Sequence, residues 1–222
     1  MGLVILAITV LVRLALYHLT GSSIKSQRAL QELQPKMSAI KKQYADDKQK
    51  QTQAIMELYK TNKVNPLTSC LPMLVQLPIL IALYMVLRDG LDSKNLADSL
   101  YSFVANPGTI NQISLGFFNM AKPNYVLAVF AGLAQYWQAK TLSRKNPPQE
   151  AGAGGKDEAM MSMMNKQMLY FMPAMTVLIG LSLPAGLTLY WFFGTVLMAL
   201  QQIYVSKKTK TNNNVVEGEV VK

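Results

Sequence analysis

The stretch from Gln167 to Ser206, QMLYFMPAMTVLIGLSLPAGLTLYWFFGTVLMALQQIYVS, contains forty consecutive residues without a charged side chain. A helix that crosses the hydrocarbon core of a bilayer needs about 20 apolar residues, so the stretch fits two spans better than one. The segment 183–186, Leu-Pro-Ala-Gly, predicts the tight turn between them. Lys166 precedes the stretch and Lys207 follows it, which places both ends at one basic side. The pattern therefore predicts a helical hairpin within a membrane.

Three further apolar segments precede this hairpin, and only 15% of the chain is charged against roughly 25% in soluble domains. The first is apolar except for Arg13 and His18, and it lacks the basic start and the cleavage site of a signal peptide. The sequence thus predicts an all-α, polytopic membrane protein with five transmembrane helices, at residues 1–20, 67–87, 123–139, 167–183 and 185–206.

The charge of the connectors predicts the orientation. Residues 21–66 hold nine Lys or Arg and four acidic residues, 140–166 hold five and three, and 207–222 hold four and two, whereas 88–122 hold three of each. Because basic connectors remain in the cytoplasm, we expect the N-terminus outside and the C-terminus inside. The net charge of +10 then indicates anionic lipids as a partner, and nucleic acid is not needed to explain it.

Residues 88–122 form the expected external connector. Its uncharged part, Ser99 to Ala121, is interrupted by Asn106-Pro107-Gly108 and further amide side chains. We interpret it as an external loop with short interfacial helices, because a sixth span would spoil the charge asymmetry between the two sides.

Residues 21–66 predict a cytoplasmic antiparallel helical hairpin. Apolar residues recur at spacings of three and four in a coiled-coil pattern, at Leu30, Leu33, Met37, Ile40 and Tyr44. Ala45-Asp46-Asp47 is a plausible turn, and a second apolar face follows at Ile55, Leu58 and Tyr59. Two interpretations remain open: a simple connector, or a docking arm for membranes, clients or ribosomes that uses Lys41 and Lys42.

Residues 140–166 form a second cytoplasmic loop, rich in methionine towards its end. Seven of the 14 methionines lie within 16 residues from Met160 to Met175, among them Met161, Met164 and Met168. Methionine suits promiscuous apolar surfaces, but ordinary packing would explain the pattern as well. Residues 207–222 are polar and are expected to be a disordered basic tail.

Arg13 is the only charged residue inside a predicted span. An arginine at the centre of a membrane helix costs about 2.5 to 3.5 kcal/mol on insertion scales. It marks a polar cavity, or else it snorkels to the nearby cytoplasmic end. Glutamines in other spans could line the same cavity or form interhelical hydrogen bonds; they are Gln76, Gln135, Gln138, Gln201 and Gln202. Trp191 is also deep in its span and outside any interfacial belt.

Motifs for catalysis are missing. The chain has one histidine and one cysteine, and it contains no HExxH, GxSxG or Walker motif. We therefore expect no catalytic residue, no metal site and no cofactor, and we do not expect an enzyme. A small channel or transporter and a structural membrane anchor for a cytoplasmic partner remain alternatives.

Several motifs in order along the chain resemble the YidC/Oxa/Alb family of membrane protein insertases, in the bacterial form without a large external domain. They are Val12-Arg13-Leu14, the cytoplasmic hairpin, residues 65–79 (NPLTSCLPMLVQLPI), Asn106-Pro107-Gly108, Leu115-Gly116, residues 184–191 (PAGLTLYW) and Gln201-Gln202. Tyr17-His18 stand where the family commonly has a proline, and Thr195 stands where it often has asparagine. Few residues precede the first span, so an incomplete N-terminus and a missing leader remain open.

The resemblance implies a mechanism in the bacterial plasma (inner) membrane. Five helices would enclose a hydrated groove that is open to lipid and cytoplasm and closed outside, lined by Arg13, Gln76, Gln138, Trp191 and Gln201. The polar segment of a nascent membrane protein would enter the groove, and its apolar helix would slide into lipid. The hairpin and the methionine-rich loop would recruit clients, with the ribosome and the Sec translocon as further partners.

Overall fold

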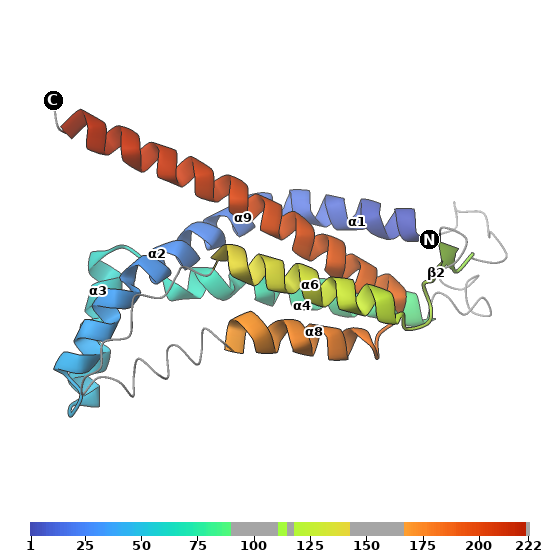
Figure 1. Ribbon diagram of the computed structural model, residues 1–222, viewed down its shortest axis with the longest axis horizontal. Coiled ribbons are helices and arrows are strands. Elements are labelled where there is room, and N and C mark those ends of the chain that lie inside the picture. The colour runs from blue at the N-terminus through green and yellow to red at the C-terminus, as the bar shows by residue number, and fades with distance from the viewer. Residues whose placement is uncertain (90–110, 115–117, 143–166, 221–222) are drawn as a thin grey trace.

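The computed structural model describes residues 1–89, 111–114, 118–142 and 167–220, and this part of the chain is almost entirely helical. Helices α1, α4, α6, α8 and α9 lie lengthwise beside one another (Figure 1). Their bounds, with those of the hairpin helices α2 and α3 and the π-helix η2, are α1 Gly2–Ala15, α2 Tyr17–Gln43, α3 Lys48–Thr61, α4 Pro66–Asp89, α6 Tyr125–Leu142, η2 Gln167–Phe171, α8 Met172–Gly180 and α9 Ala185–Val220.

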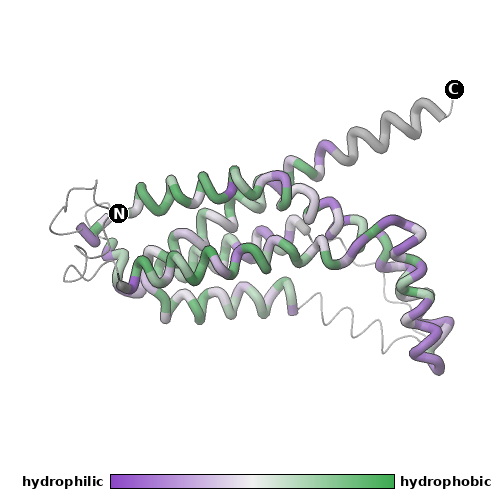
Figure 2. Tube along the Cα trace, turned by 180° about the vertical axis from the view of Figure 1, so that it is seen from behind, coloured by the Kyte–Doolittle hydropathy of each residue, from purple (hydrophilic) through white to green (hydrophobic). Residues whose placement is uncertain are grey.

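The length and composition of the apolar helices indicate a membrane protein with several transmembrane spans. Two described helices, α4 and α9, are long and apolar enough to cross a bilayer, and the bent pair α1–α2 would make a third. Helix α6 has 18 residues but carries polar Gln135, Gln138 and Lys140, while Gln167–Gly180 is a shorter apolar helix. Figure 2 shows apolar residues along the bundle and polar ones over the α2–α3 hairpin. The count of five spans therefore stays a prediction.

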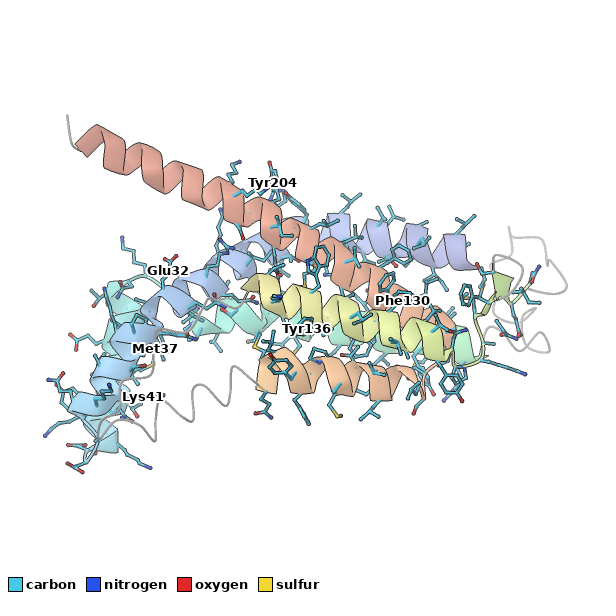
Figure 3. The ribbon with its side chains drawn as sticks, in the orientation of Figure 1. Glu32, Met37, Lys41, Phe130, Tyr136 and Tyr204 are labelled. Atoms are coloured by element: carbon cyan, nitrogen blue, oxygen red, sulfur yellow. The ribbon has the colours of Figure 1, made fainter. Side chains whose placement is uncertain are left out.

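Helices α2 and α3 form a hairpin beyond one end of the bundle (Figure 1). The Asp47 carboxylate caps α3 by accepting the amides of Gln49 at 3.1 Å and Lys50 at 3.0 Å, which explains why the chain turns there. The bonds from the Lys50 amide and its ammonium lower the pKa of the Asp47 carboxyl. The Tyr59 hydroxyl reaches the sulfur of Met37 at 3.4 Å, so the predicted apolar faces do meet. Figure 3 shows Met37 and Lys41 on the α2 arm.

The opposite end of the bundle is closed by apolar packing and backbone hydrogen bonds. The first amides of α9 bond to the segment before α6, from Ala185 to the Lys122 carbonyl at 2.9 Å and from Gly186 to that of Met120 at 3.0 Å. The buried core gathers at this end and comprises Ile5, Leu87, Met120, Leu127, Ala185, Leu187 and Tyr190. These contacts pack α1, α4, α6 and α9 together at this end.

The structure differs from the sequence-based expectation in three places. The first apolar segment, predicted at 1–20, bends by 64° after α1, and α2 continues directly into the hairpin. Within 88–122, an antiparallel pair joins β1 (Ile113–Ser114) to β2 (Phe118–Asn119), while the rest of the expected interfacial helices lies outside the described residues. The segment expected to be a disordered tail continues α9 to Val220, and it contains no proline that would end the helix.

Candidate polar site inside the bundle

Arg13 lies in the last turn of α1 and is directed at the backbone of α9. A Cβ atom added to Gly194 would lie 2.9 Å from Nη2 of Arg13 and 3.5 Å from its Nε. The first separation is shorter than real Cβ atoms show, while the second is an ordinary van der Waals contact, so the absence of a side chain at Gly194 lets the guanidinium lie close to α9. A charged group thus lies against a helix backbone inside the bundle.

The depth of this contact bears on the snorkelling alternative. Gly194 follows the first residue of α9 by nine positions and precedes Lys207 by thirteen, which corresponds to about 14 Å and about 20 Å along a helix. A snorkelling side chain would extend towards the basic end. The guanidinium instead lies against a residue well inside the apolar part of α9, which favours an internal role.

Two polar side chains connect this position to α4. The amide nitrogen of Gln76 donates to the hydroxyl of Tyr190 at 2.7 Å, and Tyr190 is only 3% exposed. Tyr190 lies one turn before Gly194, the residue against which Arg13 lies, on the same side of α9. Arg13 of α1 and Gln76 of α4 therefore both contact α9, at positions one turn apart.

The other three predicted groove residues have separate places. The amide nitrogen of Gln201 donates to the backbone carbonyl of Tyr17 in the first turn of α2, at 2.9 Å. Gln138 is half-buried in α6, and its backbone carbonyl accepts the hydroxyl of Thr141 at 2.7 Å. Trp191 is half-buried in α9, next to Tyr190. For Gln201 the structure shows the hydrogen-bond interpretation, whereas the lining role of all three stays a prediction.

Three of the residues expected to meet lipid or client, Lys41, Lys42 and Met168, are among the described residues. Lys41 is half-buried and Lys42 is exposed in the last turn of α2. Met168 in η2 is 52% exposed, while Met161 and Met164 lie outside the described residues. Within the residues that the structure describes, no group of three or more His, Cys, Asp or Glu side chains could hold a metal ion.

Sequence reasoning gave no role to Gly194, Tyr190 and Thr195, although it included Gln202 among the possible lining residues. Gly194 lies against Arg13 and Tyr190 bonds to Gln76, while the buried Thr195 (4% exposed) and Gln202 (2%) put further polar groups on α9. Spacing along the last span would have revealed them, since Gly194 and Gln201 are seven residues apart, as are Thr195 and Gln202. A separation of seven returns a side chain to nearly the same face of a helix.

Comparison with known proteins gives the family of this chain. The family model described as "60Kd inner membrane protein" matches residues 1–213. A Fusobacterium nucleatum protein named "Membrane protein insertase YidC" is 37% identical over 93% of this chain and 86% of its own length. The chain belongs to the family of YidC membrane protein insertases.

Other relatives in this family carry the same printed name. The Oceanobacillus iheyensis protein is 34% identical over 93% of this chain and 74% of its own length. The Legionella pneumophila (strain Corby) protein is 37% identical over 93% of this chain, but this chain spans only 32% of that longer protein. Together with the apolar helices, this membership indicates a multi-pass protein of a bacterial inner membrane.

The bond between Gln76 and Tyr190 gives a first prediction. We expect a double-mutant cycle of Gln76→Met and Tyr190→Phe to give a coupling energy of about 1 kcal/mol in the free energy of unfolding. This value lies in the upper half of those for hydrogen bonds between membrane helices. Unfolding of the purified chain in detergent, with all four proteins side by side, measures it. Tyr204→Phe is the matched control, because Tyr204 is 59% exposed on the same helix (Figure 3). Purely additive losses from the two single changes would refute the coupling.

Proposed function

We propose that this chain is a membrane protein insertase that passes polar segments of nascent membrane proteins through a hydrated groove around Arg13 and releases their apolar helices into lipid. The observation that carries the proposal is the guanidinium of Arg13 against Gly194, deep in the bundle. Family membership supports the class of activity and the class of client.

The physical barrier to insertion is the dehydration of a client's polar groups. Moving an amide or hydroxyl from water into an apolar medium costs a few kcal/mol without a hydrogen bond, and an ionised carboxylate costs far more. Arg13, Tyr190 and Gln76 offer a positive charge and hydrogen-bonding groups at membrane depth. A polar client segment that forms hydrogen bonds with these side chains would cross a shorter stretch of hydrocarbon.

The two ends of the bundle support access from one side. The end with β1 and β2 is sealed by the core around Leu187 and by the bonds from Ala185 and Gly186 to the preceding loop. Towards the other end the buried side chains include the polar ones of Thr20, Ser23, Thr195 and Gln202, among apolar neighbours such as Ile24 and Ala199. The basic connectors belong to this second end. We therefore place it in the cytoplasm, with the N-terminus outside and the C-terminus inside.

The proposal extends to partners at the cytoplasmic end. The hairpin carries Lys41 and Lys42 near its tip, which suits anionic lipid headgroups. Exposed Met168, together with Met161 and Met164, offers a pliable apolar contact for clients. Ribosomes and a Sec translocon would be met by the same basic surfaces.

The charge of Arg13 should decide the insertion of clients with acidic external tails. Arg13→Ala should slow their insertion about tenfold, whereas Arg13→Lys should retain most of it, because a scattered acid needs charge more than bidentate geometry. Gly194→Leu should resemble Arg13→Ala, since its side chain would occupy the place of the guanidinium. Proteoliposomes with the purified chain and a single-span client measure the rate.

The control for that experiment is Leu133→Ala, a change at a lipid-facing residue of α6 that is 57% exposed. It should leave insertion near the wild-type rate. Normal insertion of every client by well-folded Arg13→Ala and Gly194→Leu variants would show that the arginine has no part in the reaction.

The lysines of the hairpin should bind anionic membranes. Purified chain in nanodiscs is sedimented with anionic liposomes, and the bound fraction is measured. Changing Lys41, Lys42, Lys48 and Lys50 to glutamate should lower this fraction, and added salt should lower it for the wild type in the same way. Neutral phosphatidylcholine liposomes serve as the control surface. Equal binding by wild type and variant would reduce the hairpin to a connector.

A further inference from the structure

Two adjacent glutamines near the middle of α9, shortly before Lys207, bond to different neighbours. Gln201 reaches α2 and Gln202 reaches α6, and α9 packs against both of these helices. Consecutive residues of a helix point about 100° apart, so one dipeptide can serve two sides. The groove prediction alone does not account for this double engagement.

The bond of Gln201 bears on the bend between α1 and α2. Sharp bends in helices usually arise at proline, at glycine, at a π-bulge or where a side chain bonds into the backbone ladder. Residues 3–20 contain neither proline nor glycine, yet the chain bends by 64° around Leu16. The amide of Gln201 donates to the carbonyl of Tyr17, the first residue after the bend, at 2.9 Å. This bond ties the start of α2 to α9.

The bond of Gln202 connects the other side of α9 to α6. Its side chain is 2% exposed, and its Oε1 lies 2.9 Å from the hydroxyl of Thr141 in the last turn of α6, which has one proton for this oxygen or for the backbone carbonyl of Gln138 at 2.7 Å. A buried amide oxygen is costly unless it is paired, which favours the bond to Gln202. It fixes the cytoplasmic end of α6 against α9.

The two bonds lie on the two faces of α9 that carry the polar centre. Gln201 is seven residues beyond Gly194, the residue on which Arg13 rests, and so shares its face. Gln202 is seven residues beyond the buried Thr195 on the neighbouring face. The dipeptide therefore sits at the cytoplasmic end of both faces, between the first span and the third.

We propose that Gln201 and Gln202 are positioning residues, a two-sided staple on α9 that holds α2 on one side and α6 on the other and so sets the opening through which Arg13 is reached. The inference rests on the proposed function for the existence of that opening, but the staple itself is a matter of helix separation. In this proposal Gln201 holds the two helices together and does not line the groove.

A distance measurement tests the staple without reference to insertion. Spin labels on Lys25→Cys in α2 and Lys140→Cys in α6, both at exposed residues, report the separation of these helices in a Cys70→Ser chain in nanodiscs. The distance is measured by double electron–electron resonance. We expect a longer mean distance and a broader distribution in each of the variants Gln201→Met, Gln202→Met and Thr141→Val. Gln135→Met, the same change at another half-buried glutamine of α6, should leave it as in the wild type.

One substitution separates a donor from a merely polar lining residue. Gln201→Glu keeps the size and hydrophilicity of the side chain, but an ionised carboxylate cannot donate to the Tyr17 carbonyl. We expect it to behave like Gln201→Met in the distance measurement. A lining residue would tolerate the change, and its distance distribution would match the wild type.

Insertion of a single-span client by the same variants completes the test, with thermal unfolding as a check of folding. We expect insertion to slow roughly fivefold, the effect of losing about one net hydrogen bond, wherever the distance distribution changes. Wild-type distances in all staple variants would overturn the staple. Changed distances with wild-type insertion rates would overturn its role in the opening. A failure of the proposed function is seen separately, as normal insertion by Arg13→Ala.

Discussion

A guanidinium inside an apolar bundle is the constraint on which the rest of this structure depends. A positive charge at membrane depth is costly unless polar groups surround it, so the fold must provide a place for it. Gly194 provides that place by having no side chain where Arg13 crosses α9. Tyr190, one turn earlier on α9, bonds to Gln76 on α4. These contacts explain why the interior of this bundle is polar in the middle.

Helix α9 organises the bundle around this centre, because it packs against α1, α2, α4 and α6. Its first residues belong to the core, in which Ala185 and Leu187 are almost completely buried. Its later buried residues include polar Thr195 and Gln202, at 4% and 2% exposure, alongside apolar Ala199 and Val205. The proposed access from a single side needs such polar groups in the interior together with apolar packing at the other end.

Local pattern was enough to predict part of this architecture. The α2–α3 hairpin follows from apolar residues at helical spacing and from an aspartate that caps the second helix, all within one short segment. Arg13 and Gln76 could be chosen from the sequence because a charge and an amide are conspicuous in apolar helices. Their contacts with α9, one turn apart, could not, since they depend on how three distant helices pack.

The bend after α1 shows the limit most clearly. No residue near Leu16 predicts it, and the side chain bonded beside it comes from a position 184 residues further along the chain. The pairing of β1 with β2 and the continuation of α9 beyond Lys208 were likewise not expected from composition. The count of five spans remains a prediction from the sequence, because α6 carries polar residues and the segment formed by η2 and α8 is short. The bend depends on contacts between distant segments, and sequence periodicity does not record them.

One-sided access of water to the polar centre is the central claim, and thiol labelling measures it most directly. In a Cys70→Ser chain, Trp191→Cys lies in the proposed groove, and Leu187→Cys lies one turn closer to the sealed end, where the native residue is 1% exposed. A membrane-impermeant thiol reagent should label Trp191→Cys from the side of the α2–α3 hairpin only, and it should leave Leu187→Cys unlabelled from either side. Equal labelling of Trp191→Cys from both sides, or none from the hairpin side, would contradict the account.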